Sequence, residues 1–188
     1  APPLMWVEAL DLLLTRAQKA GAPLGQIAAI SGSGQQHGSV YLKKEALKLL
    51  RALDPRKKLV EQLRKAFAVQ DSPVWMDSST SAQCRARDRA LGGAQAVAAL
   101  TGSRSCERFT GNQIAKIRSK QPEAYAATGR IALVSSFCAS LLIGDYAPIE
   151  PGDGAGMNLM NLRTRAWSPA ALACTAKNLA ARLGAIVP

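Results

Sequence analysis

Near the start of the chain, hydrophobic residues recur at spacings of three and four, as they do on one face of an amphipathic helix. The apolar positions of this predicted helix are Trp6, Ala9, Leu10, Leu13, Leu14 and Ala17. Gly21 follows and is expected to end the helix. A short apolar run at residues 26–31 then predicts a strand, and a polar loop follows at residues 32–38. A helix, a strand and a polar loop in this order are typical of a βαβ layer and indicate an α/β fold.

The rest of the chain predicts one more short strand, at residues 72–77, and otherwise mainly helices. Residues 43–67 are expected to form two short amphipathic helices whose leucines face inward. Residues 145–156 are rich in turn-forming residues. The predicted helices are started or interrupted at Asp54-Pro55, Gly92-Gly93, Thr110, Pro122 and Ser168-Pro169, with Ser168 as a candidate N-cap.

The length and composition of the chain limit the class of protein to which it can belong. A chain of 188 residues is long enough for one domain with a hydrophobic core. With 48% hydrophobic and 20% charged residues, it does not belong to the disordered proteins, which combine low hydrophobicity with high charge. We therefore expect a folded protein.

The net charge of +11 first suggests a protein that binds an anionic partner such as nucleic acid. The excess is local, because residues 43–65 contain nine basic and only three acidic residues. No helix-turn-helix, KH or RNP1 pattern accompanies this segment. A basic nucleic-acid-binding or scaffold module using residues 43–65 stays open as the alternative function. We favour the solvated outer face of a helical pair, so we expect no nucleic-acid partner.

The cysteines and the apolar runs indicate the cellular compartment in which the protein is expected. Cys84, Cys106, Cys138 and Cys174 include no C-x-x-C pair, which disfavours a zinc ribbon or a compact disulfide scaffold and favours reduced thiols. The longest uncharged run, residues 131–144, has 14 residues, whereas a spanning helix needs about 20. The sequence predicts a soluble, cytoplasmic protein that has no membrane partner.

The loop at residues 32–38 is the first candidate site. It lacks the third glycine of a dinucleotide-binding turn and the Gly-Lys-Ser/Thr ending of a phosphate-binding loop. Gln36 and His37 can nevertheless hydrogen-bond the hydroxyl groups of a polyol or sugar. A solvent-facing turn is the alternative interpretation of the loop, and a structural role, which is the usual one for a lone histidine, is the alternative for His37. Since His37 is the sole histidine, the sequence offers no His-ligated metal site.

Three further charged positions each have two interpretations. Asp77 follows Trp75-Met76 and either binds a ligand's hydroxyl groups or caps the helix expected near Ser79. Arg108 either binds a ligand or forms a surface ion pair with its neighbour Glu107. Asp153, near Glu150, has no calcium-loop spacing and is interpreted as part of a solvated turn.

Five segments together indicate a family. In chain order they are residues 30–39 (Ile-Ser-Gly-Ser-Gly-Gln-Gln-His-Gly-Ser), 73–79 (Pro-Val-Trp-Met-Asp-Ser-Ser), 100–104, 107–117 and 154–159. With this order and spacing, the chain resembles the xylulose kinases of the FGGY carbohydrate kinase family, and the eukaryotic ones in particular. The resemblance extends over essentially the whole chain.

The resemblance implies an actin-like, ribonuclease H-like ATPase in which a sugar and ATP meet in a cleft between domains. In that family the 5-hydroxyl of D-xylulose receives the γ-phosphoryl group of ATP, with Mg²⁺ as a cofactor of the full-length enzyme. It implies that His37 binds the sugar, with Gln36 beside it, and that Arg108 reaches the sugar hydroxyls. Asp77 matches the carboxylate of the family's Trp-x-Asp segment and is assigned to the substrate site.

The chain also departs from the family pattern. Family members begin with an aspartate-containing strand that faces the phosphates, and this chain starts in the helix that follows it. The family's catalytic aspartate lies in a Gly-Asp-Asn segment, which does not occur here. We therefore expect residues 1–188 to form part of an FGGY N-terminal, sugar-binding domain that lacks its first strands and the C-terminal kinase domain. No catalytic residue is assigned, and neither ATP nor Mg²⁺ is expected to bind this chain tightly. A pseudo-kinase that pairs with a partner is a third interpretation.

Overall fold

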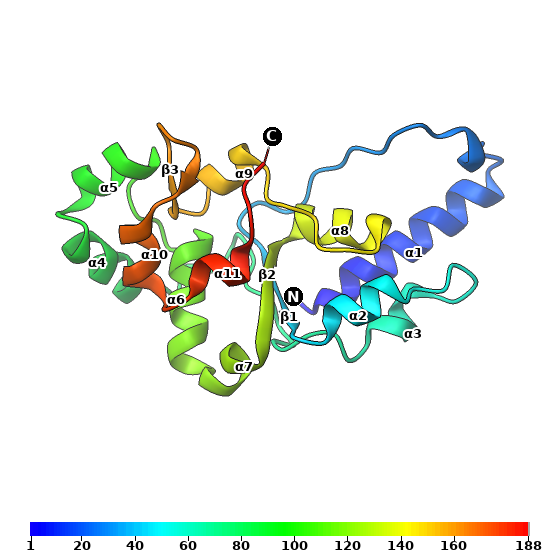
Figure 1. Cartoon of the computed structure of the whole chain (residues 1–188), viewed down its shortest axis with the longest axis horizontal. Coiled ribbons are helices and arrows are strands. Elements are labelled where there is room, and N and C mark those ends of the chain that lie inside the picture. The colour runs from blue at the N-terminus through cyan, green and yellow to red at the C-terminus, as the bar shows by residue number, and fades with distance from the viewer. Residues whose placement is uncertain (188) are drawn as a thin grey trace.

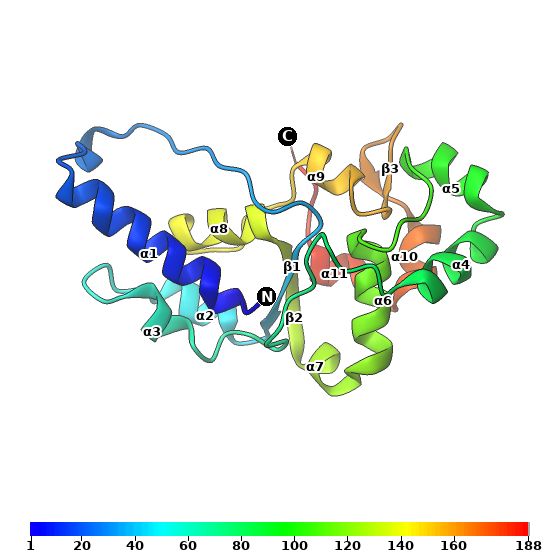
Figure 2. The ribbon, with the colours of Figure 1, turned by 180° about the vertical axis from the view of Figure 1, so that it is seen from behind.

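The computed structural model describes residues 1–187 as helices packed on both sides of a two-stranded antiparallel ribbon. The ribbon consists of β1 (Ser39–Lys43) and β2 (Thr128–Leu133), in a register that pairs Val40 with Ala132. Figures 1 and 2 show this ribbon in the middle of an elongated molecule, with helices to either side. The fold class predicted from the sequence, a mixture of helices and strands, is confirmed.

Each face of the ribbon contributes to a different hydrophobic core. Tyr41, Ile131 and Leu133 point into one cluster of buried residues. Val40 and Leu42, which alternate with them, point into the other, because successive side chains of a strand lie on opposite faces. Both strands are therefore covered on both sides, and every residue of β2 except Gly129 is buried.

One core is covered by four helices from the first half of the chain and from the segment after β2. These are α1 (Pro3–Lys19), α2 (Ala46–Arg51), α3 (Leu59–Leu63) and α8 (Val134–Ile143). The helices α6 (Thr110–Lys120), α7 (Pro122–Ala127), α10 (Pro169–Thr175) and α11 (Leu179–Leu183) cover the other core. Beside them lie α4 (Ser81–Ala90), α5 (Ala94–Thr101), α9 (Pro151–Ala155) and a short hairpin of β3 (Met160–Asn161) and β4 (Ala166–Trp167).

Most of the predicted helices are confirmed, because their boundaries are set by local chemistry. The Ser168 hydroxyl accepts a hydrogen bond from the Ala171 backbone nitrogen at 3.3 Å, as an N-cap does. Gly92 and Gly93 separate α4 from α5 with φ angles of 88° and 103°, which glycine adopts readily. The predicted pair at residues 43–67 forms as α2 and α3, although both are shorter than predicted, and Phe67 forms a β-bridge with Leu42.

Both strands that the sequence predicted, at residues 26–31 and 72–77, are wrong, and β1 and β2 were both missed. Residues 24–26 form a 3₁₀ turn, and the chain then runs to β1 as a long unpaired arc, drawn in blue in Figures 1 and 2. Ile27 and Ile30 are 48% and 63% exposed, since no strand lies beside them. A strand is stable only when its backbone groups are paired, so the apolar run alone is not enough. The expected βαβ order is replaced by the antiparallel β1–β2 pair.

Ion pairs already occupy part of the basic segment at residues 43–65. Arg51 contacts Asp145 at 2.8 Å, and Arg56 contacts Asp54 at 3.0 Å. Leu50 and Leu63 are buried in the core beneath, so the pair of helices is a packed element with a charged outer face. This arrangement gives no support to the alternative of a nucleic-acid-binding module. Within residues 1–187, no helix has the length and hydropathy that crossing a bilayer would require.

Candidate functional site

The loop at residues 32–38 lies directly on the first turn of α8, and two of its glycines make this close approach feasible. A side chain at position 34 would overlap the backbone nitrogen of Ser135. A Cβ atom at position 38 would lie 2.9 Å from Cγ2 of Val134. The glycines therefore serve close packing of this loop against the helix, which holds Gln36 and His37 in a defined place.

His37 has a strained backbone that its neighbours hold in place. Its φ angle is 60°, in the left-handed region that residues other than glycine seldom adopt. The Thr110 hydroxyl donates a hydrogen bond to the His37 carbonyl oxygen at 3.2 Å. The rings of His37 and Phe109 lie 4.8 Å apart, with an angle of 55° between their planes. The start of α6 thus packs against the loop, although the two are far apart in sequence.

The electrostatic surroundings keep the imidazole of His37 neutral at pH 7. Burial lowers its pKa below the usual 6.5, and the nearby guanidinium of Arg108 also lowers it. A backbone hydrogen bond to Gly156 and the carboxylate of Asp153 act in the opposite direction and do not overcome the burial. A neutral imidazole has one nitrogen that donates and one that accepts a hydrogen bond, which suits a hydroxyl partner.

Arg108 lies immediately before Phe109 and is exposed. Its Nε donates a hydrogen bond to Sγ of Cys106 at 3.4 Å. In the part of the chain that the structure describes, it forms no ion pair with Glu107, whose carboxylate instead accepts a hydrogen bond from Ser81 at 3.1 Å. The surface-pair interpretation of Arg108 is therefore wrong, and the guanidinium lies close enough to His37 to lower the pKa of the imidazole.

A cavity of about 490 Å³ lies beside the loop. Gln36 lines it together with Ser135 from α8, Asp153 from α9 and Glu150, the N-cap of α9. The Ser135 hydroxyl donates a hydrogen bond to the Asp153 carboxylate. Asp153, interpreted from the sequence as part of a solvated turn, thus lies in a helix and faces both the loop and His37. A larger cavity of about 760 Å³ lies between α1, residues 53–59 and the end of α8, and none of the predicted site residues lines it.

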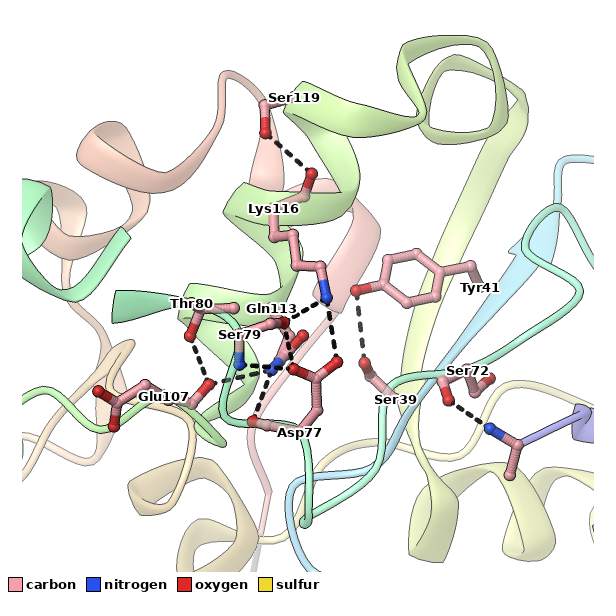
Figure 3. Close-up of polar contacts among 11 residues, drawn as sticks. Ser39, Tyr41, Ser72, Asp77, Ser79, Thr80, Glu107, Gln113, Lys116 and Ser119 are labelled. Atoms are coloured by element: carbon pink, nitrogen blue, oxygen red, sulfur yellow. Dashed lines mark hydrogen bonds and ion pairs between the residues drawn. The ribbon is translucent and has the colours of Figure 1, made fainter. Parts of the chain in front are cut away.

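Asp77 lies in a separate polar network on the side of α6 (Figure 3). Its carboxylate accepts hydrogen bonds from the Ser79 backbone nitrogen at 2.9 Å and from Nζ of Lys116 at 3.1 Å. Gln113 donates a hydrogen bond to the Asp77 carbonyl oxygen at 3.2 Å. None of these described contacts reaches His37 or Arg108. Asp77 stabilises the turn at residues 77–79 and anchors it to α6, rather than capping α4, whose N-cap is Thr80.

The contacts of Asp77 predict that its contribution to the stability of the fold depends on pH. Burial by itself would raise the pKa of Asp77, but the hydrogen bonds from Ser79, Lys116 and Gln113 outweigh it and lower the pKa well below the usual 3.8. A carboxylate with a depressed pKa stabilises the fold above its unfolded-state pKa and loses that contribution as the pH falls through its folded-state value. We expect Asp77→Asn to lower the free energy of unfolding at pH 7 by about 1 kcal/mol.

Urea denaturation at pH 7 and at pH 3 measures this effect. The difference between wild type and Asp77→Asn is expected to shrink at pH 3, because the wild-type carboxylate then contributes less. Asp71→Asn, which changes an exposed carboxylate, is the control. An equal loss at both pH values would show that the charge of Asp77 contributes nothing.

The described residues include no cluster of metal-ligating side chains. Within residues 1–187, no group of three or more His, Cys, Asp or Glu side chains is arranged to hold a metal ion. We therefore assign no Mg²⁺ ligands within residues 1–187.

The sequence reasoning missed Phe109, Thr110, Asp153 and Gly156 as neighbours of His37. Phe109 and Thr110 adjoin the candidate Arg108 and could have been included with it. The region of Asp153 and Gly156 looked like a turn, because Pro151-Gly-Asp-Gly has a low helix propensity. The structure brings Gln36, His37 and Arg108 to one region and places the contacts of Asp77 elsewhere.

Comparisons with known proteins show what the chain is similar to. The mouse protein named xylulose kinase is 53% identical over 188 residues, which are 100% of this chain and 34% of the mouse protein. Xylulose kinase 2 of Arabidopsis thaliana is 53% identical with the same coverage. The chain thus spans about a third of the length of these curated relatives.

Solved structures show the same fold at low sequence identity. The crystal structure of a xyloylose kinase from Brucella ovis superposes with a TM-score of 0.79 at 19% identity, and the match covers 100% of this chain and 34% of that one. The xylulose kinase from Bifidobacterium adolescentis gives a TM-score of 0.66 at 19% identity, covering 88% of this chain and 35% of that one. Residues 3–187 also match the N-terminal domain of a single family. The chain therefore belongs to the FGGY family of carbohydrate kinases, and it corresponds to the N-terminal domain of that family.

Proposed function

We propose that this chain is the sugar-binding part of an ATP-dependent kinase that converts D-xylulose to D-xylulose 5-phosphate. One observation carries the proposal: the loop with His37 packs against Phe109 and Thr110, with the rings of His37 and Phe109 4.8 Å apart, so that the neighbouring Arg108 lies in the same region although it is distant in sequence. The 53% identity to eukaryotic proteins named xylulose kinase supports D-xylulose as the sugar. In the reaction, the 5-hydroxyl oxygen forms a bond to the γ-phosphorus of ATP, and the bond to the ADP leaving group breaks.

The roles of the individual residues follow from their chemistry. Arg108 donates hydrogen bonds to the sugar hydroxyls, and the neutral imidazole of His37 both donates and accepts them. Gln36 lines the neighbouring cavity and adds an amide that can do the same. Asp77 contributes to the site by holding α6 through Lys116, at 3.1 Å, so that Arg108 stays near the loop. ATP, bound with Mg²⁺ in the full-length enzyme, supplies the phosphoryl group.

The proton of the 5-hydroxyl needs an acceptor, and no residue of this chain is assigned that role. Transfer of a phosphoryl group requires positioned nucleotide phosphates and a base near the nucleophile. Both are proposed to come from the part of the kinase that this chain does not include. We also propose a cytoplasmic location, which the four free cysteines favour.

The isolated chain is expected to release no ADP in response to D-xylulose. A coupled assay of ADP release measures this, with the full-length protein that contains the chain as the positive control. The full-length protein is expected to turn over D-xylulose faster than other ketoses. Turnover by the isolated chain would refute the division of roles, and an inactive full-length protein would favour the pseudo-kinase interpretation.

A further inference from the structure

Gly156 lies directly against the imidazole of His37. A Cβ atom at position 156 would be 3.2 Å from Cε1 and 3.4 Å from Nδ1 of the ring. At such distances the ring would have to move by a few tenths of an ångström. The φ angle of Gly156 is −69°, an ordinary helical value that any residue adopts. The backbone therefore does not require glycine here, and what glycine provides is room for the ring.

Contacts with the start of α6 also restrict His37. Phe109 packs against the ring at 4.8 Å, and Thr110 donates a hydrogen bond to the His37 carbonyl oxygen at 3.2 Å. The left-handed backbone of His37, at φ 60°, costs free energy that only well-fixed surroundings offset. Such strain is often found where a side chain is held for a function. The imidazole is thus restricted on the α9 side and on the α6 side.

We propose that Gly156 is a positioning residue for sugar binding, whose backbone holds the His37 imidazole in one orientation and one tautomer. The inference rests on the proposed function, because it assigns a role to the ring nitrogen that Gly156 leaves free. It goes beyond that function by naming the element, the C-terminal end of α9, that orients the sugar-binding histidine.

The chemistry of a neutral imidazole explains why one tautomer matters. Gly156 lies beside the Cε1 and Nδ1 edge of the ring, and its backbone raises the pKa of His37, as a carbonyl oxygen facing a ring N–H does. We infer that this oxygen keeps the proton on the ring nitrogen that faces it. The other nitrogen then presents a lone pair, which accepts a hydrogen bond from a sugar hydroxyl. The same hydroxyl oxygen can accept a hydrogen bond from Arg108. Two charged groups face the ring, Arg108 and Asp153, and their opposite effects on its pKa partly cancel.

The first test uses this chain itself. Because His37 is the only histidine, its imidazole ¹⁵N signals are unambiguous in a labelled sample. We expect one dominant tautomer in the wild type and a changed tautomer ratio in Gly156→Ala. Gly152→Ala is the matched control, since it makes the same change at the other end of α9 and the three atoms nearest its added Cβ all belong to the flexible Glu150 side chain. A wild-type ring that populates both tautomers equally, or an unchanged ratio in Gly156→Ala, would overturn the proposal.

The second test is kinetic and uses the full-length kinase. Gly156→Ala is expected to raise the KM for D-xylulose about fivefold with a smaller effect on kcat, since it weakens a hydrogen bond to the substrate. Gly152→Ala is expected to leave both constants unchanged. In a His37→Ala background, Gly156→Ala is expected to have no further effect, because there is no ring to displace.

The experiments distinguish a failure of the sugar-binding role of His37 from a failure of the positioning role of Gly156. If His37→Ala leaves the KM unchanged, the sugar-binding role of His37 is wrong, and the role of Gly156 falls with it. If His37→Ala raises the KM but Gly156→Ala does not, the proposed function stands and the positioning role of Gly156 is overturned. If Gly156→Ala raises the KM equally with and without the imidazole, Gly156 acts through something other than His37, which also overturns the inference.

Discussion

Replacing Arg87 by methionine is expected to lower the free energy of unfolding by about 3 kcal/mol, because it leaves several buried acceptors without a donor. Arg87 is only 3% exposed. Its Nε donates to Oδ1 of Asn112 at 2.9 Å, and its two terminal nitrogens donate to the Asn158 carbonyl and the Thr175 hydroxyl at 2.8 Å each. One side chain thus joins α4, α6, α10 and the turn before β3.

Thermal or urea unfolding measures this effect. For a chain of this size, a loss of 3 kcal/mol corresponds to a decrease in Tm of roughly 10 °C. Arg89→Met is the matched control, since Arg89 lies on the exposed side of the same helix. Arg87→Lys is expected to recover little, because a lysine cannot reach acceptors in three directions. Equal stabilities of Arg87→Met and Arg89→Met would show that the network contributes nothing to the fold.

Replacing His37 by alanine in the full-length kinase is expected to raise the KM for D-xylulose about tenfold, which corresponds to ~1.4 kcal/mol of binding free energy. This is the amount that a well-formed hydrogen bond contributes, and the effect on kcat is expected to be smaller. Steady-state kinetics with varied D-xylulose measures it. An unchanged KM would mean that the histidine is structural.

The backbone of His37 calls for a second variant. Its φ angle of 60° disfavours alanine, so part of any effect of His37→Ala could come from a displaced loop. Asparagine tolerates this conformation and keeps a side chain that can hydrogen-bond. We therefore expect His37→Asn to keep the loop in place and to recover part of the affinity for the sugar. An effect of His37→Asn as large as that of His37→Ala would argue for a requirement that only imidazole meets.

The candidate site was predictable in part from the sequence. Gln36 and His37 were evident because amides and a histidine follow glycines in a polar loop, and the family resemblance added Arg108 and Asp77. The contacts of Asp77 with Lys116 were not predictable, since the two residues lie on opposite sides of a long helical segment. Arg87 was equally hidden, because nothing near it in the sequence distinguishes it from Arg85 and Arg89, which are exposed.

The sequence by itself determined the family, most of the helices and the loop that carries the candidate histidine. These depend on neighbouring residues: a proline or serine at a helix start, a glycine at its end, and apolar spacing along one face. Only the tertiary structure decided which strands pair, which arginine is buried, and that Gly156 faces His37. Those outcomes depend on contacts between distant segments, and local propensity does not encode them. The run at residues 26–31 is an example: its apolar residues favour a strand, but a strand forms only where another strand lies beside it.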